Sequence, residues 1–190
     1  MKVSMIAALS ENRVIGKDNK LPPWKAPGDL KRFKELTTNK VVIMGRNTYQ
    51  SIRDMTPKEK EVLPDRLKIV ISTTMEPEGK ILVVDNLEFA MHFARAMIAK
   101  FKMPEEIMII GGAKVYQTAL PVSDRLYLTR VKGEFEGDTY FPAVDFSSGW
   151  KLVEEQVFET HSFNTYDRVP VVIPEVAAPS PVEVPKEESK

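Results

Sequence analysis

The sequence predicts an α/β fold: a mostly parallel β-sheet covered by helices on both faces. Short runs rich in Val, Ile and Leu alternate with segments of helical periodicity along most of the chain. At 190 residues, the chain is long enough for one sizeable core and short for two domains. Two late runs alternate apolar and polar residues, which predicts an antiparallel hairpin at one edge and makes the sheet mixed.

The predicted core strands are short apolar runs. The first, at 3–9, follows Lys2 and leads directly into polar residues. It lacks both a cleavage pattern and an 18-residue apolar span, which favours a buried strand over a signal peptide or membrane helix. Further strands are expected at 40–44, 67–71, 81–84, 106–110 and 125–131, and hairpin strands at 151–159 and 163–169.

Helical segments are expected between these strands. The first opens at Pro27 and Gly28, a second follows Gly45, and a third spans 87–100 with Asn86 as its cap. A fourth covers 113–120 and stops at Pro121. The charged stretch 53–61 is predicted to be an exposed loop.

The last 21 residues differ in composition from the rest. Residues 170–190 contain five prolines and show neither strand nor helix periodicity. We expect a domain at 1–169 and an extended, disordered tail at 170–190. Its composition leaves open whether the tail is an inert linker or tethers a partner.

Charge and cysteine content exclude several functions. Lys+Arg and Asp+Glu both total 27, so no overall field attracts nucleic acid or an anionic membrane. The absence of Cys excludes disulfides, thiolate metal sites and a thiol nucleophile, and is compatible with a cytoplasmic location. No metal site is predicted.

Asp29 is the first candidate for site chemistry. With a helix beginning near Gly28, Asp29, Phe33 and Thr37 are spaced i, i+4 and i+8 and share one face. Such a face suits a flat heterocycle, because a carboxylate can accept two N–H bonds from a guanidine-like edge. The alternative is a surface acid in the first helical turn.

Two strand–glycine–helix junctions are candidates for anion binding. One places Arg46 and Thr48 after Gly45, and the other has the pair Gly111-Gly112 before a helix. Helix N-termini and close backbone approach suit phosphates, although ordinary turns look the same and the G-x-G-x-x-G pattern is absent. Thr129, in an apolar strand, needs a hydrogen-bond partner, which its own backbone could supply.

Taken together and in order, these segments resemble the dihydrofolate reductase family over about residues 1–169. The matching motifs lie at 6–8, 14–16, 24–33, 44–48, 63–66, 110–112, 127–129 and 136–142. The resemblance implies a twisted eight-stranded mixed sheet with about four flanking helices. It also implies a cytoplasmic monomer that reduces 7,8-dihydrofolate to tetrahydrofolate with NADPH, supports one-carbon and thymidylate metabolism, and is a target of antifolates.

The resemblance also assigns residues to the substrate. Asp29 would hold the amino edge of the pteridine with Thr129 beside it, and Arg66 would bind the α-carboxylate of the glutamate tail. Trp24 and Leu21 would join Asp29 in catalysis. The remaining substrate positions would be Ile6, Ala8, Leu30, Phe33, Ile52, Leu63, Ile110 and Tyr116.

For NADPH, the resemblance implies a cis peptide at Gly111-Gly112 and a 2′-phosphate near Arg46, Thr73 and Lys114. The full cofactor set would be Ala7, Ile15, Gly16, Gly45, Arg46, Asn47, Thr48, Ser72, Thr73, Gly111, Gly112, Ala113, Lys114 and Val115.

Nitrogen 5 of the substrate must gain a proton during hydride transfer to carbon 6. No His falls in a candidate pocket segment, so Asp29 is the ionisable group expected near the ring. We expect it to polarise the pteridine and favour protonation through water.

The chain departs from the family pattern in two places. The doubled Pro22-Pro23 adds a residue to the loop expected to cover the site and predicts a stiffer lid. The stretch from Ile52 to Arg66 is longer than usual. Two other functions stay open: a related reductase acting on a pyrimidine intermediate of riboflavin synthesis, and a non-catalytic module that kept the fold.

Overall fold

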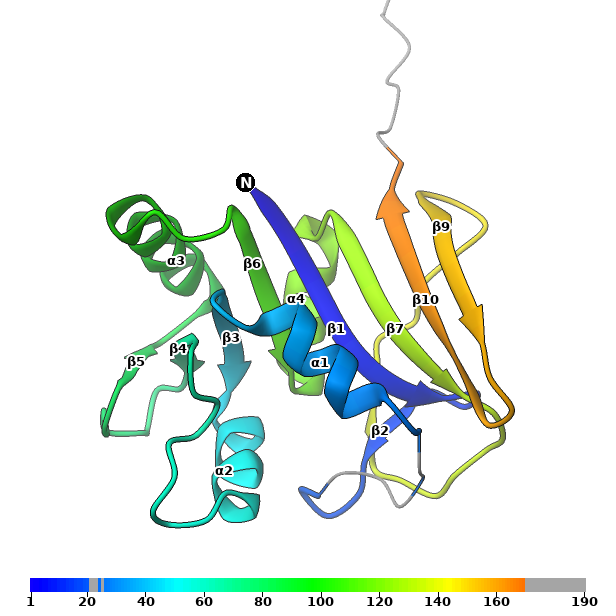
Figure 1. Ribbon diagram of the computed structural model, residues 1–190, viewed down its shortest axis with the longest axis horizontal. Coiled ribbons are helices and arrows are strands. Elements are labelled where there is room, and N and C mark those ends of the chain that lie inside the picture. Colours follow the sequence, from blue (N-terminus) through cyan, green and yellow to red (C-terminus); the bar gives the residue numbers. More distant parts are fainter. Residues whose placement is uncertain (21–23, 25, 170–190) are drawn as a thin grey trace, which may run out of the picture.

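The centre of the molecule is an eight-stranded sheet. The computed structural model describes residues 1–20, 24 and 26–169. The strand order is β5-β4-β3-β6-β1-β7-β10-β9, which Figure 1 shows from left to right. The strands are β1 (Lys2–Ser10), β3 (Val41–Gly45), β4 (Leu67–Ile71), β5 (Ile81–Val84), β6 (Glu106–Gly111), β7 (Arg125–Val131), β9 (Trp150–Val157) and β10 (His161–Arg168).

Strand β1 lies in the middle because it is apolar on both faces. Met5 is fully buried and Ile6 is 7% exposed, although successive residues point to opposite faces. β1 pairs in parallel with β6 on one side and β7 on the other. Such doubly buried strands are typical of parallel sheets covered by helices.

The hairpin β9–β10 completes the sheet in the opposite direction. β10 pairs antiparallel with β7, and β9 pairs antiparallel with β10 at the edge. The predicted mixed, mostly parallel sheet is confirmed.

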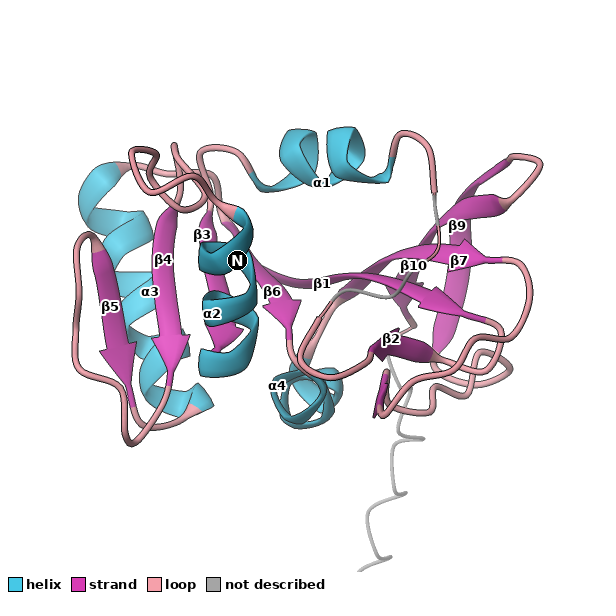
Figure 2. Ribbon diagram, turned by 90° about the horizontal axis from the view of Figure 1, so that it is seen from below, coloured by secondary structure: helices cyan, strands magenta, loops and turns pink. Residues whose placement is uncertain are grey.

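Four α-helices within the described residues cover the two faces. Buried residues of α3 (Leu87–Phe101) and α4 (Ala113–Ala119) share one core cluster, while α1 (Asp29–Thr37) and α2 (Arg46–Met55) pack on the other. Figure 2 shows α1 and α4 on opposite sides of the sheet. The predicted cap of α3 is confirmed, since the Asn86 side chain accepts a 3.0 Å hydrogen bond from the Phe89 amide.

The structure differs from the expectations at a few boundaries. Helix α2 continues through 53–55, so the irregular loop begins only at Thr56. A two-stranded ribbon of β2 (Val14–Gly16) and β8 (Thr139–Tyr140) was not predicted, and a 3₁₀ turn at Leu120–Val122 follows α4.

Pro22, Pro23 and the tail 170–190 lie outside the described residues. Within the described part of the chain, the helices are too short or too polar to cross a membrane.

Candidate active site

The candidate site centres on a hydrogen bond between α1 and β7. Asp29 is the first residue of α1, and Gly28 before it has φ 88°, a left-handed conformation that glycine adopts without strain. Thr129 Oγ1 donates to Asp29 Oδ1 at 2.6 Å. Thr129 is buried and Asp29 is half-buried. The hydroxyl therefore finds its partner in Asp29 rather than in its own backbone.

Tyr116 lies beside this pair. Its hydroxyl donates to the Ile6 carbonyl oxygen at 2.7 Å. Burial raises the pKa of Tyr116 well above its usual range, and the negative charge of Asp29 raises it further. The phenol thus stays protonated and fixed against β1.

The wall next to Asp29 is apolar. Ala8 is the register partner of Thr129, and Ile6 is the partner of Tyr127, so alternate residues of β1 share the face of Thr129. Ile6 and Ile110 belong to the core cluster on this face, and Phe33 of α1 packs against it. These residues frame the space between α1 and the sheet.

The other end of α1 meets Arg66. Its guanidinium lies 5.8 Å from the centre of the Phe33 ring. Nε donates to Thr37 Oγ1 at 2.9 Å, and Nη1 donates to the Pro64 carbonyl at 2.6 Å. Thr37 is fully buried. It therefore holds Arg66 in place and does not face a ring site, contrary to the expectation from its spacing.

Three further apolar side chains are substrate candidates. Ile52 and Leu63 are partly buried and pack against the cluster under α1. Leu30, by contrast, is 76% exposed although it is a large apolar residue. Isolated exposed leucines are common, but this one follows Asp29 directly and adds apolar surface at the site.

A glycine cradle lies at the carboxyl ends of β3 and β6, which are neighbours. A Cβ on Gly45 would approach a Val115 methyl to 3.2 Å, and a Cβ on Gly112 would approach Thr48 Oγ1 to 3.0 Å. The Gly111-Gly112 peptide is cis, as predicted. Without side chains at these glycines, the two strand ends pack closely against Val115 of α4 and Thr48 of α2.

Polar groups border the cradle. Arg46 Nη1 donates to Thr74 Oγ1 at 2.8 Å, which brings Arg46 to the loop after β4. Ser72 Oγ accepts from the amides of Thr74 and Met75 and shapes that loop. Thr73 and Lys114 are exposed; Thr73 lies in the loop after β4, and Lys114 is the second residue of α4, which follows β6.

The remaining cofactor candidates surround the cradle. Ile15 packs against the cluster that contains Ala7 and Val115. Gly16 ends β2, and its carbonyl accepts from the Asp138 amide at 3.2 Å. Asn47 Nδ2 donates to Asn19 Oδ1 at 3.1 Å, linking α2 to the loop after β2. Ala113 is the first residue of α4.

Trp24 and Leu21 are the two further residues predicted to act in catalysis. Trp24 is partly buried and packs edge-on against Phe135, with ring centres 5.1 Å apart. Leu21 lies outside the described residues.

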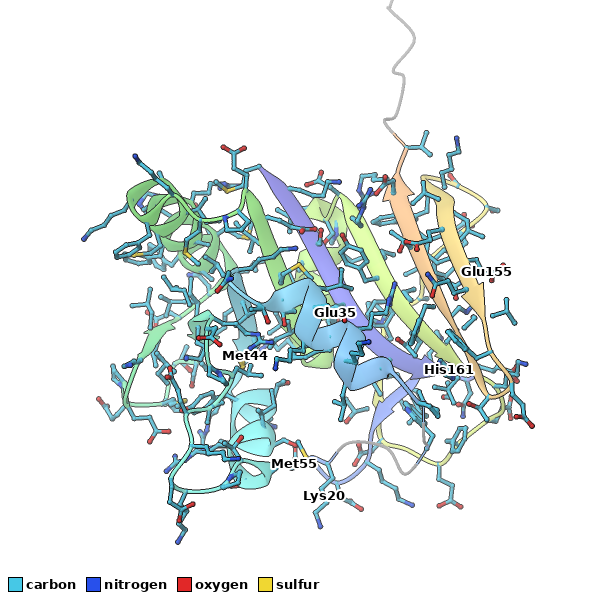
Figure 3. The ribbon with its side chains drawn as sticks, viewed as in Figure 1. Lys20, Glu35, Met44, Met55, Glu155 and His161 are labelled. Carbon is cyan, nitrogen blue, oxygen red and sulfur yellow. The ribbon has the colours of Figure 1, made fainter. Side chains whose placement is uncertain are left out.

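Two residues near the site were missed from the sequence. His161 lies where β10 begins, at the end of the sheet where the chain enters α1 (Figure 3). Burial lowers its pKa, while the Asp29 charge and the Pro27 backbone oppose that shift. Arg32 of α1 lies over the Phe163 ring at 4.8 Å. Both contacts need the late hairpin to fold beside α1, which no local signal indicates.

Comparison with known proteins decides the family. A family model described as dihydrofolate reductase matches residues 2–173. The chain belongs to the dihydrofolate reductase family. Among its relatives, the dihydrofolate reductase of Bacillus subtilis is 39% identical over 87% of this chain and 89% of its own length. That of Haemophilus influenzae is 37% identical over 88% and 94%.

A solved dihydrofolate reductase shares the fold. The structure from Enterococcus faecalis, complexed with NADP(H) and RAB-propyl, has a TM-score of 0.72 and 33% identity. The match covers 88% of this chain and 96% of that one. The predicted family, fold class, enzyme class and cofactor are confirmed, and the matches favour dihydrofolate reductase over the related reductase of riboflavin synthesis.

Proposed function

We propose that this chain reduces 7,8-dihydrofolate to 5,6,7,8-tetrahydrofolate with NADPH, using Asp29 to hold the pteridine ring. The observation that carries the proposal is the hydrogen bond between Thr129 and Asp29 at an apolar space between α1 and the sheet. One oxygen of the carboxylate is oriented by this bond, so the other can accept from an amino group of the ring.

The apolar wall supports recognition of a flat ring. Ile6, Ala8 and Ile110 come from adjacent strands, and Phe33 faces them from α1. Such a slot gives stacking contacts and excludes water, while a single carboxylate supplies orientation. Leu30, Ile52 and Leu63 extend apolar surface toward Arg66, which suits an aminobenzoyl group that ends in a carboxylate.

The proton at nitrogen 5 is the part of the chemistry that these residues can influence. Asp29 stabilises positive charge on the ring from its amino edge, so it favours a protonated nitrogen 5 without touching that atom. Tyr116 stays protonated and keeps its bond to Ile6, so it offers no base. We propose that water delivers the proton and that Trp24 and Leu21 act with Asp29 in catalysis.

The residues at the glycine cradle fit NADPH. Gly45 and Gly112 let the carboxyl ends of β3 and β6 pack closely against Thr48 and Val115, in the first turns of α2 and α4. When bound, NADPH supplies the hydride that carbon 6 of the substrate receives. The start of α2 and Arg46 would hold phosphate groups, and Thr73 and Lys114 would lie near the 2′-phosphate.

The test is turnover by the purified full chain with NADPH and 7,8-dihydrofolate. Absorbance of the reduced nicotinamide should fall, and replacing dihydrofolate by the pyrimidine intermediate of riboflavin synthesis should give no turnover. Loss of reduced nicotinamide with the pyrimidine alone would assign the rival activity. No turnover with either, despite NADPH binding, would favour a non-catalytic module.

The proposal includes a cytoplasmic monomer whose catalytic domain is 1–169. Analytical ultracentrifugation at micromolar concentration should give one species near the 21.5 kDa mass of the chain. A truncated chain ending at Val169 should keep full activity if the tail is a linker for this reaction.

A further inference from the structure

We propose that Lys68 is a positioning residue for the aminobenzoyl-glutamate end of the substrate, because its buried ammonium holds the loop that carries Leu63 and leads to Arg66. This inference rests on the proposed function. It concerns the loop at 56–66, hereafter the 56–66 loop, which connects α2 to β4.

Lys68 occupies an unusual place for a lysine. It is the second residue of β4, and it is 2% exposed. Its neighbour at i+2, Val70, belongs to the core cluster under α1 and α2, so Lys68 points to the same face. A charged group seldom stays in such a place unless it is paired and hydrogen-bonded.

The partners of the Lys68 ammonium both lie in the 56–66 loop. Nζ donates to Glu61 Oε1 at 2.6 Å and to the Leu63 carbonyl at 3.3 Å. Lys68 holds the pKa of Glu61 below its usual range through this bond and its charge. Lys80 lies 3.9 Å from the other Glu61 oxygen but is 83% exposed.

The loop depends on this anchor for its shape. Leu63 and Asp65 have φ values of 46° and 59°, which are left-handed conformations that non-glycine residues adopt at a cost. Surrounding contacts must hold such residues in place. Among the hydrogen bonds between described residues, only those from Lys68 tie residues 57–63 to the sheet, and one ends on the Leu63 carbonyl itself.

Packing on the outer side of the loop cannot replace the anchor. A hollow of about 450 Å³ lies between the loop, α2 and the segment before β5, with Tyr49, Arg53, Glu61 and Glu78 among its lining residues. Val62 also lines this hollow, and Leu63, on the inner side, is only partly buried. The paired charge, rather than dense packing, therefore sets the loop conformation.

The position of the 56–66 loop matters for substrate binding because the loop carries Leu63 and ends at Arg66. Leu63 adds apolar surface beside Phe33 and Ile52, and Arg66 follows three residues later with Nη1 bonded to the Pro64 carbonyl. A looser loop would spread both groups over several positions. Affinity for the aminobenzoyl-glutamate moiety should fall while the pteridine pocket and the cofactor cradle stay intact.

The test compares Lys68→Met with the matched control Lys80→Met. Methionine fills the buried space without a charge, and the Glu61 carboxylate that it leaves behind is 40% exposed and can stay solvated. We expect Lys68→Met to raise the KM for dihydrofolate about tenfold, with kcat and the KM for NADPH within about twofold of wild type. Lys80→Met should match wild type throughout.

A truncated substrate separates positioning from general damage. With 6-methyl-7,8-dihydropterin, which lacks the aminobenzoyl-glutamate, kcat/KM of Lys68→Met should equal that of wild type. An equal loss with both substrates, or an unchanged KM for dihydrofolate, would overturn the inference.

Hydrogen exchange supplies a readout that needs no activity. Amides of the 56–66 loop should exchange faster in Lys68→Met, and unchanged exchange there would contradict the proposal.

A second variant tests the same pair if Lys68→Met does not fold. Glu61→Gln breaks the charge pair from the solvent side and should raise the KM for dihydrofolate by about threefold. An unchanged KM would count against the anchor. A wild-type chain that does not reduce dihydrofolate would instead refute the proposed function.

Discussion

Thr129 Oγ1 donates to Asp29 Oδ1 at 2.6 Å, across 100 positions of sequence, and this bond joins the middle of the sheet to the first turn of α1. A hydrogen bond to a charged group contributes about 1.5 to 3 kcal/mol. Thr129→Val keeps the shape of the side chain and removes this donor. We expect kcat/KM for dihydrofolate to fall between about tenfold and a hundredfold. Steady-state kinetics measures this, and NADPH affinity should not change, since Thr129 lies on β7 and the glycine cradle is formed by β3 and β6. Equal losses for both ligands would indicate a general distortion of the site.

Replacing Asp29 tests the group that holds the ring. Asp29→Asn keeps an acceptor but removes the negative charge that stabilises a protonated pteridine. At neutral pH we expect turnover to fall by more than about a hundredfold, with NADPH binding close to wild type by fluorescence titration. A variant with full activity would remove Asp29 from the mechanism.

A second buried polar cluster, at the amino ends of the central strands, supports stability. Glu106 pairs with Lys40 and accepts from Ser4 Oγ at 2.5 Å and from the Tyr127 hydroxyl at 3.3 Å. Burial alone would raise the pKa of Glu106, but these hydrogen bonds and the Lys40 charge outweigh it and hold the pKa below its usual range.

Glu106→Gln removes the charge and leaves Lys40 without its counter-ion. We expect the free energy of unfolding at pH 7 to fall by about 2 to 3 kcal/mol, measured by urea denaturation. Because the carboxyl pKa is depressed in the folded state, the stabilisation is complete above the unfolded pKa and is lost as pH falls through the folded one. The gap between wild type and variant should therefore narrow below about pH 4.

A surface ion pair provides the control for this experiment. Glu136 pairs with Lys17 but is 90% exposed. Glu136→Gln should leave the free energy of unfolding unchanged at pH 7 and below about pH 4. A gap that stays constant from pH 7 to about pH 3 for Glu106→Gln would show that packing, not charge, explains its effect.

The central strands could be predicted because each is a run of β-branched and other apolar residues. The bounds predicted for 67–71, 81–84 and 125–131 match the structure. The β2–β8 ribbon escaped prediction because strands of two or three residues show no periodicity. Helix α2 extends into a charged stretch that composition assigns to a loop, since tertiary packing outweighs local propensity.

The candidate site likewise contains some residues that the sequence indicates and others that it does not. The glycines at 45, 111 and 112 stand out in sequence because they end apolar strands. The partner of Asp29, by contrast, comes from a strand 100 residues away, and its role followed from the family resemblance. Arg32 and His161 could not be assigned, because their surroundings arise only when the hairpin packs against α1.

His161 makes the fold sensitive to pH in a range different from that of Glu106. It is 1% exposed, stacks on Phe158 with ring centres 4.7 Å apart, and its Nε2 has no hydrogen-bond partner among the described residues. Its lowered pKa means that the unfolded chain binds the proton more readily. Stability should therefore be complete above the unfolded pKa of about 6.5 and decrease as pH falls below it.

His161→Phe removes the titrating group and keeps an aromatic ring in the same place. The melting temperature of wild type should fall between about pH 7 and pH 5, while the variant should show a shallower change over this range. Differential scanning calorimetry in matched buffers measures both. Parallel curves for the two proteins would mean that His161 does not contribute to the acid sensitivity.

Arg46 is the residue expected to select NADPH over NADH. It is exposed at the start of α2 and reaches the loop after β4 through Thr74. An arginine there can form charge-assisted hydrogen bonds to a 2′-phosphate, which NADH lacks. Arg46→Gln should raise the KM for NADPH about tenfold or more and leave the KM for NADH unchanged.

The ratio of the two KM values is the decisive quantity for Arg46. Arg53→Gln serves as the control, because Arg53 lies on the same helix but pairs with Glu78, away from the cradle. It should leave both KM values at the wild-type level. If Arg46→Gln raised both KM values equally, the arginine would act by shaping the loop through Thr74, and selection for the 2′-phosphate would lie with Thr73 and Lys114.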